Sequence, residues 1–296
     1  MNHTRAIKLP VFVFLLLLSI SLLLLCGACC LAAPQTVRNA QTHSLALTAP
    51  PHRIISLAPG TTEMLFALGL GKYVVGDTTY CDYPPAARKI AKIGDVTVNY
   101  EKVVSLRPDL VVASDASRTA AARLRQLRVP VFAIAPTSYA SVEQSLRQLG
   151  RLTGTLPRAQ VVVARMEAAR AYAAQLARRS ARHPAVLPVI GTNPLYVAGS
   201  GTFINDLIAQ AGGQSTVAIS GYAPYSKELA LVHPPDFILA DTTLQAALTA
   251  DPVLSRLPAV RSHHFIAIDP NILNRPGPRL ADALELLARA LHPGPK

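Results

Sequence analysis

Short apolar runs alternate with amphipathic segments along most of the chain. Runs such as DLVVAS at 109–114 and DFILAD at 236–241 have the length of buried strands. Segments such as TFINDLIAQAGG at 202–213 have the apolar spacing and the glycine stop of a helix. Strands that alternate with helices indicate a parallel, doubly wound α/β sheet. The expected strands lie at 53–58, 73–78, 109–114, 129–136, 185–191, 195–199, 236–241 and 264–270.

Strand-like runs disappear between Ser141 and His183. Pro157 suits the first turn of a helix, and the apolar residues that follow it recur with a 4-3-4-3 spacing. This pattern predicts one helix of about 25 residues, roughly 37 Å long, which is enough to span two lobes. The apolar positions are Val162, Met166, Ala169, Ala173 and Leu176.

The two halves of the chain repeat each other. EKVVSLRPDLVVAS at 101–114 aligns with ELALVHPPDFILAD at 228–241, which places Glu101 on Glu228. The repeat predicts two doubly wound α/β lobes joined by a single long backbone helix. A ligand cleft is then expected between the lobes, near the strand ends.

A pattern typical of an export signal opens the chain. Arg5 and Lys8 precede an apolar run from Leu9 to Leu25, and small residues follow. We therefore expect export, with an uncleaved membrane anchor as the alternative. Cys29 closes a sequence that resembles a lipoprotein processing box and is the candidate for lipidation, whereas cleavage after Ala32 would leave no lipid.

These patterns divide the chain into five parts. The expected parts are the export signal at 1–33, a polar tether at 34–51, an N-terminal α/β lobe at 52–140, a helical linker at 141–183 and a C-terminal α/β lobe at 184–296. Within the N-terminal lobe, a helix is expected at 61–71 with Thr61 or Thr62 as its cap.

Composition narrows the range of functions. The chain of 296 residues has 29 Lys and Arg against 17 Asp and Glu, and much of the basic excess lies in the linker. Export, the absence of tryptophan and the lack of interleaved aromatic residues argue against nucleic acid and favour a solvated basic face. Cys81 is the one cysteine beyond the signal, so no intramolecular disulfide is expected in the exported monomer.

No arrangement of residues indicates catalysis. The sequence has no nucleophile motif, no cofactor fingerprint and no local metal-ligand signature. A secreted two-lobed enzyme is therefore the less favoured alternative, and we expect no enzymatic activity and no cofactor.

Glu101 and Glu228 occupy matched places two residues after the expected caps Asn99 and Ser226. Acids in this position stabilise a helix by a few tenths to about 1 kcal/mol. The alternative is that the two glutamates, one in each lobe, form a docking surface for a basic partner.

The stretch from RIISLAPGTTE at residue 53 to DLVVAS at residue 114 resembles the helical-backbone, or class III, substrate-binding proteins of ABC importers. These proteins deliver cobalamin, ferric siderophores or haem. TTYCDYPP at 78–85 resembles the cobalamin-binding branch most. The resemblance extends over roughly 53–293 and includes the Arg-Pro-Gly-Pro-Arg segment before the last helix.

The resemblance implies roles for individual residues. Glu101 and Glu228 match the glutamates that contact permease arginines. Tyr80 matches an aromatic position that lines the cleft, while Tyr222 and Arg275 fall near an aromatic and a polar ligand-binding position. Val96 or Thr97 and Ser114 stand where tryptophans help to enclose the corrin, which keeps a siderophore or haem open as the ligand. The implied partners are an ABC permease with its ATPase, possible attachment to a membrane through the N-terminus, and a cargo that contains cobalt or iron. The receptor is expected outside the cell membrane or in the periplasm, for import or for sensing.

Overall fold

The computed structural model describes residues 35–38, 44–95, 97–180 and 182–293. They belong to one compact unit, Gln35–Lys296. The expected export signal, with the lipidation candidate Cys29, lies outside the described residues, as does Val96. Within the described ranges, no helix is long and apolar enough to cross a membrane.

The N-terminal lobe, as far as it is described, is built on a four-stranded sheet in the order β4-β3-β5-β6, with every pair parallel. Residues of the two inner strands are almost completely buried, as expected for a sheet covered on both faces. The strands are β3 Ile54–Ser56, β4 Val74–Gly76, β5 Leu110–Ser114 and β6 Val131–Ile134, and the helices are α2 Pro59–Ala67, α3 Tyr100–Ser105 and α4 Arg118–Gln126.

Helix α2 begins one turn earlier than the sequence predicts. Pro59 occupies its first turn, where the missing N–H costs nothing, so Thr61 and Thr62 lie inside the helix instead of capping it. Their hydroxyl groups hydrogen-bond to Ser56 and to the carbonyl oxygen of Ala58. The earlier start brings the N-terminal end of α2 to the edge of the sheet where β3 ends.

The C-terminal lobe contains a mixed sheet in the order β10-β8-β7-β11-β12, and β9 pairs with β7. Strands β7, β11 and β12 are parallel, whereas β8 forms an antiparallel hairpin with β7 and pairs with β10. The strands are β7 Ala185–Thr192, β8 Leu195–Ala198, β9 Gln214–Ser215, β10 Tyr222–Pro224, β11 Phe237–Asp241 and β12 Phe265–Ile268. The helices are α7 Phe203–Gln210, α8 Lys227–Val232, α9 Gln245–Ala250, α10 Pro258–Arg261, α11 Pro270–Leu273 and α12 Leu280–Leu291.

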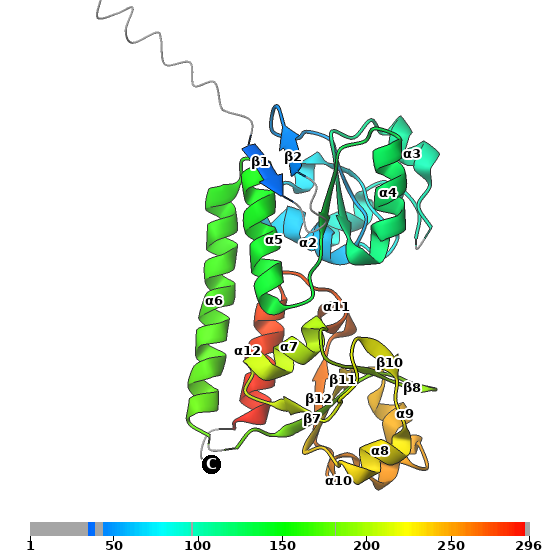
Figure 1. The fold of residues 1–296 in the computed structure, drawn as a ribbon, viewed down its shortest axis with the longest axis vertical. Helices are drawn as coiled ribbons and strands as arrows, with labels where there is room; N and C mark the ends of the chain where they lie inside the picture. The colour runs from blue at the N-terminus through cyan, green and yellow to red at the C-terminus, as the bar shows by residue number, and fades with distance from the viewer. Residues whose placement is uncertain (1–34, 39–43, 96, 181, 294–296) are drawn as a thin grey trace, which may run out of the picture. The chain divides into compact units, whose positions relative to one another are not determined.

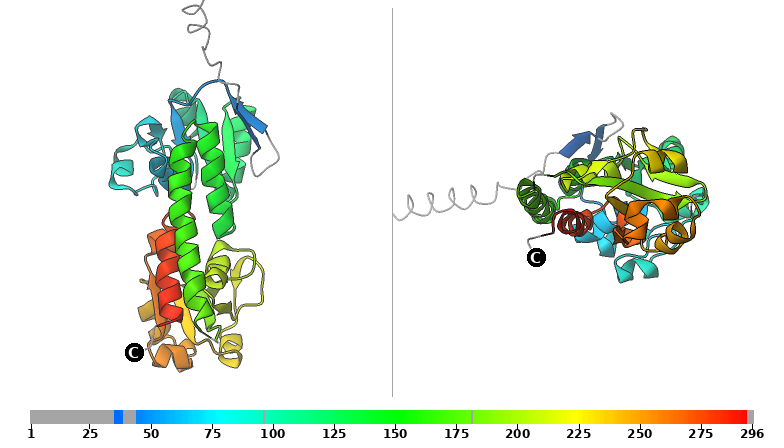
Figure 2. Two further views of the ribbon diagram at one scale, coloured as in Figure 1. Left: turned by 90° about the vertical axis from the view of Figure 1, so that its left-hand side faces the viewer. Right: turned by 90° about the horizontal axis from the view of Figure 1, so that it is seen from below.

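Helices connect the two lobes. Helix α6, Leu156–Arg178, has 23 residues and runs from one lobe to the other (Figure 1). The closing helix α12 lies beside it in both views of Figure 2, from the side and from below. The sequence predicted one helix here, but a separate helix α5, Tyr139–Leu152, precedes α6. The two are parted at Gly154, whose φ of +72° suits glycine.

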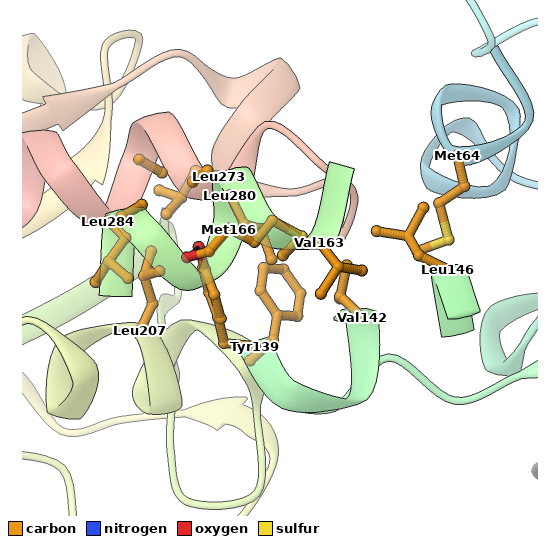
Figure 3. Packing of buried hydrophobic residues seen from close by; sticks show 14 of the residues in the cluster. Met64, Tyr139, Val142, Leu146, Val163, Met166, Leu207, Leu273, Leu280 and Leu284 are labelled. Atoms are coloured by element: carbon orange, nitrogen blue, oxygen red, sulfur yellow. Dashed lines mark hydrogen bonds between the residues drawn. The ribbon is translucent and has the colours of Figure 1, made fainter. Parts of the chain in front are cut away.

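One apolar core runs through the helices and into both lobes. Tyr139 and Val142 of α5 pack against Val163 and Met166 of α6, and Leu284 of α12 joins the same cluster (Figure 3). The buried Tyr139 hydroxyl donates to the carbonyl oxygen of Met166 over 2.8 Å. Because the core is continuous, the lobes are packed onto a common helical support and are not merely strung together.

The segment expected to be a polar tether contains paired strands. Strand β1, Gln35–Arg38, pairs antiparallel with β2, Ser44–Leu47. Leu45 and Leu47 pack against the main core. Leu45 and Leu47 are partly buried while Ala46 and Thr48 are exposed, so every second side chain of the segment faces the lobe, as in a half-buried strand.

Candidate ligand-binding site

A cavity of about 380 Å³ lies between the two lobes. The N-terminal lobe contributes 58–61 after β3, 114–116 after β5, and residues 134, 136 and 137 at the end of β6. The C-terminal lobe contributes 201–203, Tyr222 and the segment 274–276. Both lobes therefore form the walls, as a receptor cleft requires.

The N-terminal wall follows from sheet topology. Strands β3, β5 and β6 are parallel, so their carboxyl ends meet at one edge, which is where α/β sheets bind ligands. The lobes touch at Gly60, where a Cβ would lie 2.5 Å from the carbonyl oxygen of Pro276. Glycine at this position thus permits the close approach of α2 to the C-terminal segment.

The structure brings Tyr222 and Arg275 together in this cavity. Tyr222 begins the edge strand β10 and keeps 42% of its surface exposed. Partial burial raises the pKa of its hydroxyl to about 12, so the phenol stays protonated at neutral pH. Its ring offers apolar area with a hydrogen-bonding group at the edge.

Arg275 forms an ion pair across the lobes. Its Nη1 donates to Oδ1 of Asp82, and the hydrogen bond holds the pKa of that carboxyl below its usual value. The Arg275 side chain is 14% exposed, whereas that of Asp82 is 40% exposed. The guanidinium thus faces the cavity with its charge already balanced.

Tyr80 does not line the cavity. Its side chain is 55% exposed, on the loop that follows β4, two residues before Asp82. Lys92 holds this loop, because its Nζ donates to Asp77 Oδ1 over 2.7 Å and to the carbonyl oxygens of Cys81 and Ala87 over 3.0 Å. Tyr80 therefore stands on a loop that is fixed from within.

A second ion pair joins the lobes away from the cavity. Arg279 donates to both carboxylate oxygens of Glu63, over 2.8 and 2.6 Å, and to the carbonyl oxygen of Asn271. The two side chains are only 15% and 3% exposed. The guanidinium also lies 3.9 Å from the ring centroid of Tyr83. Burial raises the pKa of Glu63, and the hydrogen bond from Arg279 opposes that rise.

Sequence reasoning missed Asp82, Glu63 and Arg279 as interlobe contacts. The Arg-Pro-Gly-Pro-Arg segment drew attention to both arginines, but their partners are 193 and 216 residues away. No local spacing contains that information. Among the residues that the structure describes, no cluster of histidine, cysteine, aspartate and glutamate is placed to hold a metal ion.

The two matched glutamates begin short helices in different lobes. Asn99 caps α3 by accepting from the N–H of Lys102 over 2.9 Å, and Glu101 is exposed in the first turn. Ser226 caps α8, and its hydroxyl donates to Glu228 Oε2 over 2.7 Å. Figure 1 shows α3 and α8 on the side of the molecule away from α6.

Exposed aliphatic side chains accompany both glutamates. Val104 follows Glu101 by three residues, and Val232 follows Glu228 by four, so each pair shares one helix face. Leu229 is also exposed on α8. We call α3 in the N-terminal lobe and α8 in the C-terminal lobe the two tips. Each tip thus combines a carboxylate with apolar surface.

Comparison with known proteins assigns the chain to a class. A periplasmic binding protein family model matches residues 54–272. The chain belongs to this family, and it is a solute-binding component of an ABC import system. The family consists of transport receptors and not of enzymes.

Individual relatives cover most of the chain. An uncharacterised ABC transporter substrate-binding lipoprotein of Bacillus subtilis is 30% identical, over 88% of this chain and 86% of its own. A cobalamin-binding protein of Halobacterium salinarum is 30% identical, over 88% of this chain and 74% of its own. The solved structure of a periplasmic heme-binding protein from Roseiflexus sp. RS-1 is 34% identical, with a TM-score of 0.73 over 81% of this chain and 98% of that one. The relatives thus include proteins named for two different tetrapyrrole-like ligands.

Proposed function

We propose that the protein captures a corrinoid of the cobalamin type between its lobes and delivers it to the permease of an ABC importer. The side chains that line the cavity support a corrinoid as the ligand. Among the described lining residues, Tyr222 carries the one side chain of the kinds that ligate haem iron. A single tyrosine provides at most one such bond, whereas several other side chains of the lining offer hydrogen bonds to the periphery of a ligand.

The remaining wall suits a ring with amide side chains. Ser114, Thr137 and Asn274 supply hydroxyl and amide groups among apolar neighbours, and Arg275 supplies guanidinium donors. A corrinoid carries peripheral amides that both donate and accept hydrogen bonds. Tyr222 in the wall would contact the ring, with Tyr80, two residues before Asp82, as a second aromatic contact, and Arg275 would bind its amide oxygens.

A ligand panel tests this assignment. Purified protein is titrated with cyanocobalamin, haem and ferric siderophores, and binding is followed by fluorescence and by ultraviolet-visible spectra. We expect cyanocobalamin to bind with a Kd below about 10 μM, which corresponds to roughly 7 kcal/mol. Tight binding of haem or of a ferric siderophore without cyanocobalamin binding would replace the corrinoid with that ligand.

Glu101 and Glu228 are proposed to bind arginines of the permease. Both carboxylates are exposed at matched positions, and the apolar side chains beside them add area that a partner can bury. The hydroxyl of Ser226 holds the pKa of Glu228 below its usual value, which favours the charged form that an arginine would bind.

The receptor is proposed to act outside the cell membrane as a monomer without enzymatic activity. The signal-like pattern at 1–33 supports export, and Cys29 is the proposed site of lipidation. The parts proposed for the remainder are the lobes 52–140 and 184–296 with the linker 141–183 between them.

N-terminal mass analysis of protein from its own cells should find no peptide from residues 1–25. An intact Met1 on membrane-bound protein would instead establish an uncleaved anchor.

A further inference from the structure

Charge is balanced around the cavity. The charged residues that line it are Asp115 and Arg275. Asp115 accepts a hydrogen bond from Arg118 over 3.1 Å, and Arg275 is paired with Asp82. Among the residues that the structure describes, the cavity wall therefore offers no cation free of a carboxylate partner.

Arg275 nevertheless keeps donors for a ligand. A guanidinium has five N–H groups, and the Asp82 contact uses Nη1. In the described part of the chain, Nε and Nη2 of Arg275 donate to no acceptor. They can bind a neutral carbonyl oxygen while the ion pair stays intact.

An anionic group meets a different situation. A carboxylate that approaches Arg275 has to compete with Asp82 for the same guanidinium, or lie close to a second negative charge. Like charges at short range in a partly buried site disfavour binding, and a carboxylate that repels the wrong ligand is a recognised source of specificity.

We propose that Asp82 is a specificity-determining residue, which makes the cleft favour solutes with neutral amide groups over solutes with free carboxylates. This inference rests on the proposed function and names the chemical feature that the cleft distinguishes. Asp82 acts through Arg275 and lies outside the residues that line the cavity.

The test compares ligands that differ only in the proposed feature. Cyanocobalamin is compared with its monocarboxylic acid derivatives, in which one peripheral propionamide is hydrolysed to propionate. Wild-type protein should bind the amide form about tenfold or more tightly than the acid forms. Asp82→Asn should bring that ratio close to one by improving the binding of the acids, because Arg275 gains an unpaired charge.

Two further variants separate local pairing from net charge. Asp115→Asn removes one negative charge from the same cavity wall without touching the Arg275 pair, and it should change the ratio much less than Asp82→Asn does. Arg275→Gln should weaken both ligand forms. Thermal unfolding of each variant checks that it is folded. An unchanged ratio in Asp82→Asn, or an equal change in Asp115→Asn, would overturn the inference.

A haem arm keeps the inference separate from the corrinoid assignment. If wild-type protein binds haem and no corrinoid, the ligand proposal fails, and haem is then compared with its dimethyl ester in the same variants. Asp82→Asn should improve binding of the propionate form relative to the ester, and no such change would overturn the role of Asp82. Binding of neither ligand class would overturn both proposals.

Discussion

The two lobes come from similar sequence halves, yet they build the cleft from different parts of their folds. The N-terminal lobe presents the carboxyl ends of the parallel strands β3, β5 and β6. The C-terminal lobe presents the edge strand β10, which pairs antiparallel with β8. The tips, in contrast, keep matched helices with matched glutamates. The sequence repeat therefore does not relate the cavity-lining residues of one lobe to those of the other, whereas it does relate the two tip glutamates.

The lobes also differ in the charges that they bring to their shared boundary. The N-terminal lobe contributes the carboxylates of Glu63 and Asp82, and the C-terminal lobe contributes the guanidinium groups of Arg279 and Arg275. One pair is buried and doubly hydrogen-bonded, while the other is partly exposed beside the cavity. The difference suggests that the first pair supports the assembly of the lobes and the second serves recognition.

The largest effect is expected for the prediction that the matched glutamates of the two tips have the same docking role. The double variant Glu101→Arg with Glu228→Arg should nearly abolish uptake in cells, because each lost contact weakens docking by about 1–3 kcal/mol and the reversed charges repel permease arginines. Ligand titration of the purified variant should match the wild type.

A charge-matched variant provides the control. Glu167→Arg with Asp282→Arg changes the net charge equally on the backbone helices α6 and α12 and should leave uptake intact. Normal uptake by the tip variant would eliminate the docking role, and the glutamates would then only stabilise their helices.

The next effect concerns the two interlobe ion pairs. Glu63→Gln leaves Arg279 buried without its charge partner and should lower the free energy of unfolding by about 3 kcal/mol. Asp82→Asn breaks a pair with a 40% exposed carboxylate and should cost less than about 1 kcal/mol. Urea unfolding followed by circular dichroism measures both, and equal losses would contradict the distinction between the pairs.

A smaller effect distinguishes Tyr222, which lines the cavity, from Tyr80, which lies outside the lining. Tyr222→Ala should weaken corrinoid binding by about 1–3 kcal/mol, or roughly 5- to 150-fold, because the ring lies in the wall. Tyr80→Ala should cost less, since Tyr80 is outside the lining. Tyr172→Ala on α6 serves as the control in the same titration. A larger loss of affinity with Tyr80→Ala than with Tyr222→Ala would show that the loop of Tyr80 closes over the bound ligand.

The smallest effect concerns the loop that the N-terminal lobe holds with Lys92. Burial raises the pKa of Asp77 from 3.8 to about 6, although Lys92 opposes the rise. Between these values the folded protein keeps a proton that the unfolded chain releases, so the free energy of unfolding falls as the pH rises through this range. Asp77→Asn should remove up to about 2 kcal/mol of that dependence.

Unfolding of the wild type and the variant from pH 4 to pH 7 tests this linkage. Lys92→Met should move the sensitive range to higher pH, because it removes the charge that opposes the shift. An identical pH dependence in Asp77→Asn and the wild type would mean that Asp77 titrates at its unfolded value.

The sequence predicted what depends on local periodicity. The 4-3-4-3 spacing predicted the long helix α6, and the apolar runs predicted every strand of the two lobes except β9 and β10. The antiparallel pairing of β8 with β7 was not predicted, because an apolar run gives no information on the direction of its neighbour, and the three-residue β10 has no apolar run of its own. The strands β1 and β2 were missed because the segment that contains them is polar and flanked by prolines, which favoured a tether.

The site was predicted in part, and for a physical reason. Tyr222 and Arg275 line the cavity and Tyr80 lies outside its lining, while the ligand-binding roles that the resemblance implies for all three stay predictions. The charge of Arg275 is balanced by Asp82, which only the folded chain brings near. Residues that act in pairs across a long sequence separation leave no local pattern to read.

The close approach of Gly60 to Pro276 and the continuous helical core hold the two lobes against one another. With the docking role proposed above for Glu101 and Glu228, a receptor whose lobes are held in this way offers the same two carboxylates to a permease whether its cleft is filled or empty. Empty copies then compete with loaded copies for the transporter. We expect the rate of import to follow the loaded fraction of the receptor and not its abundance, so that overproduction without solute slows import.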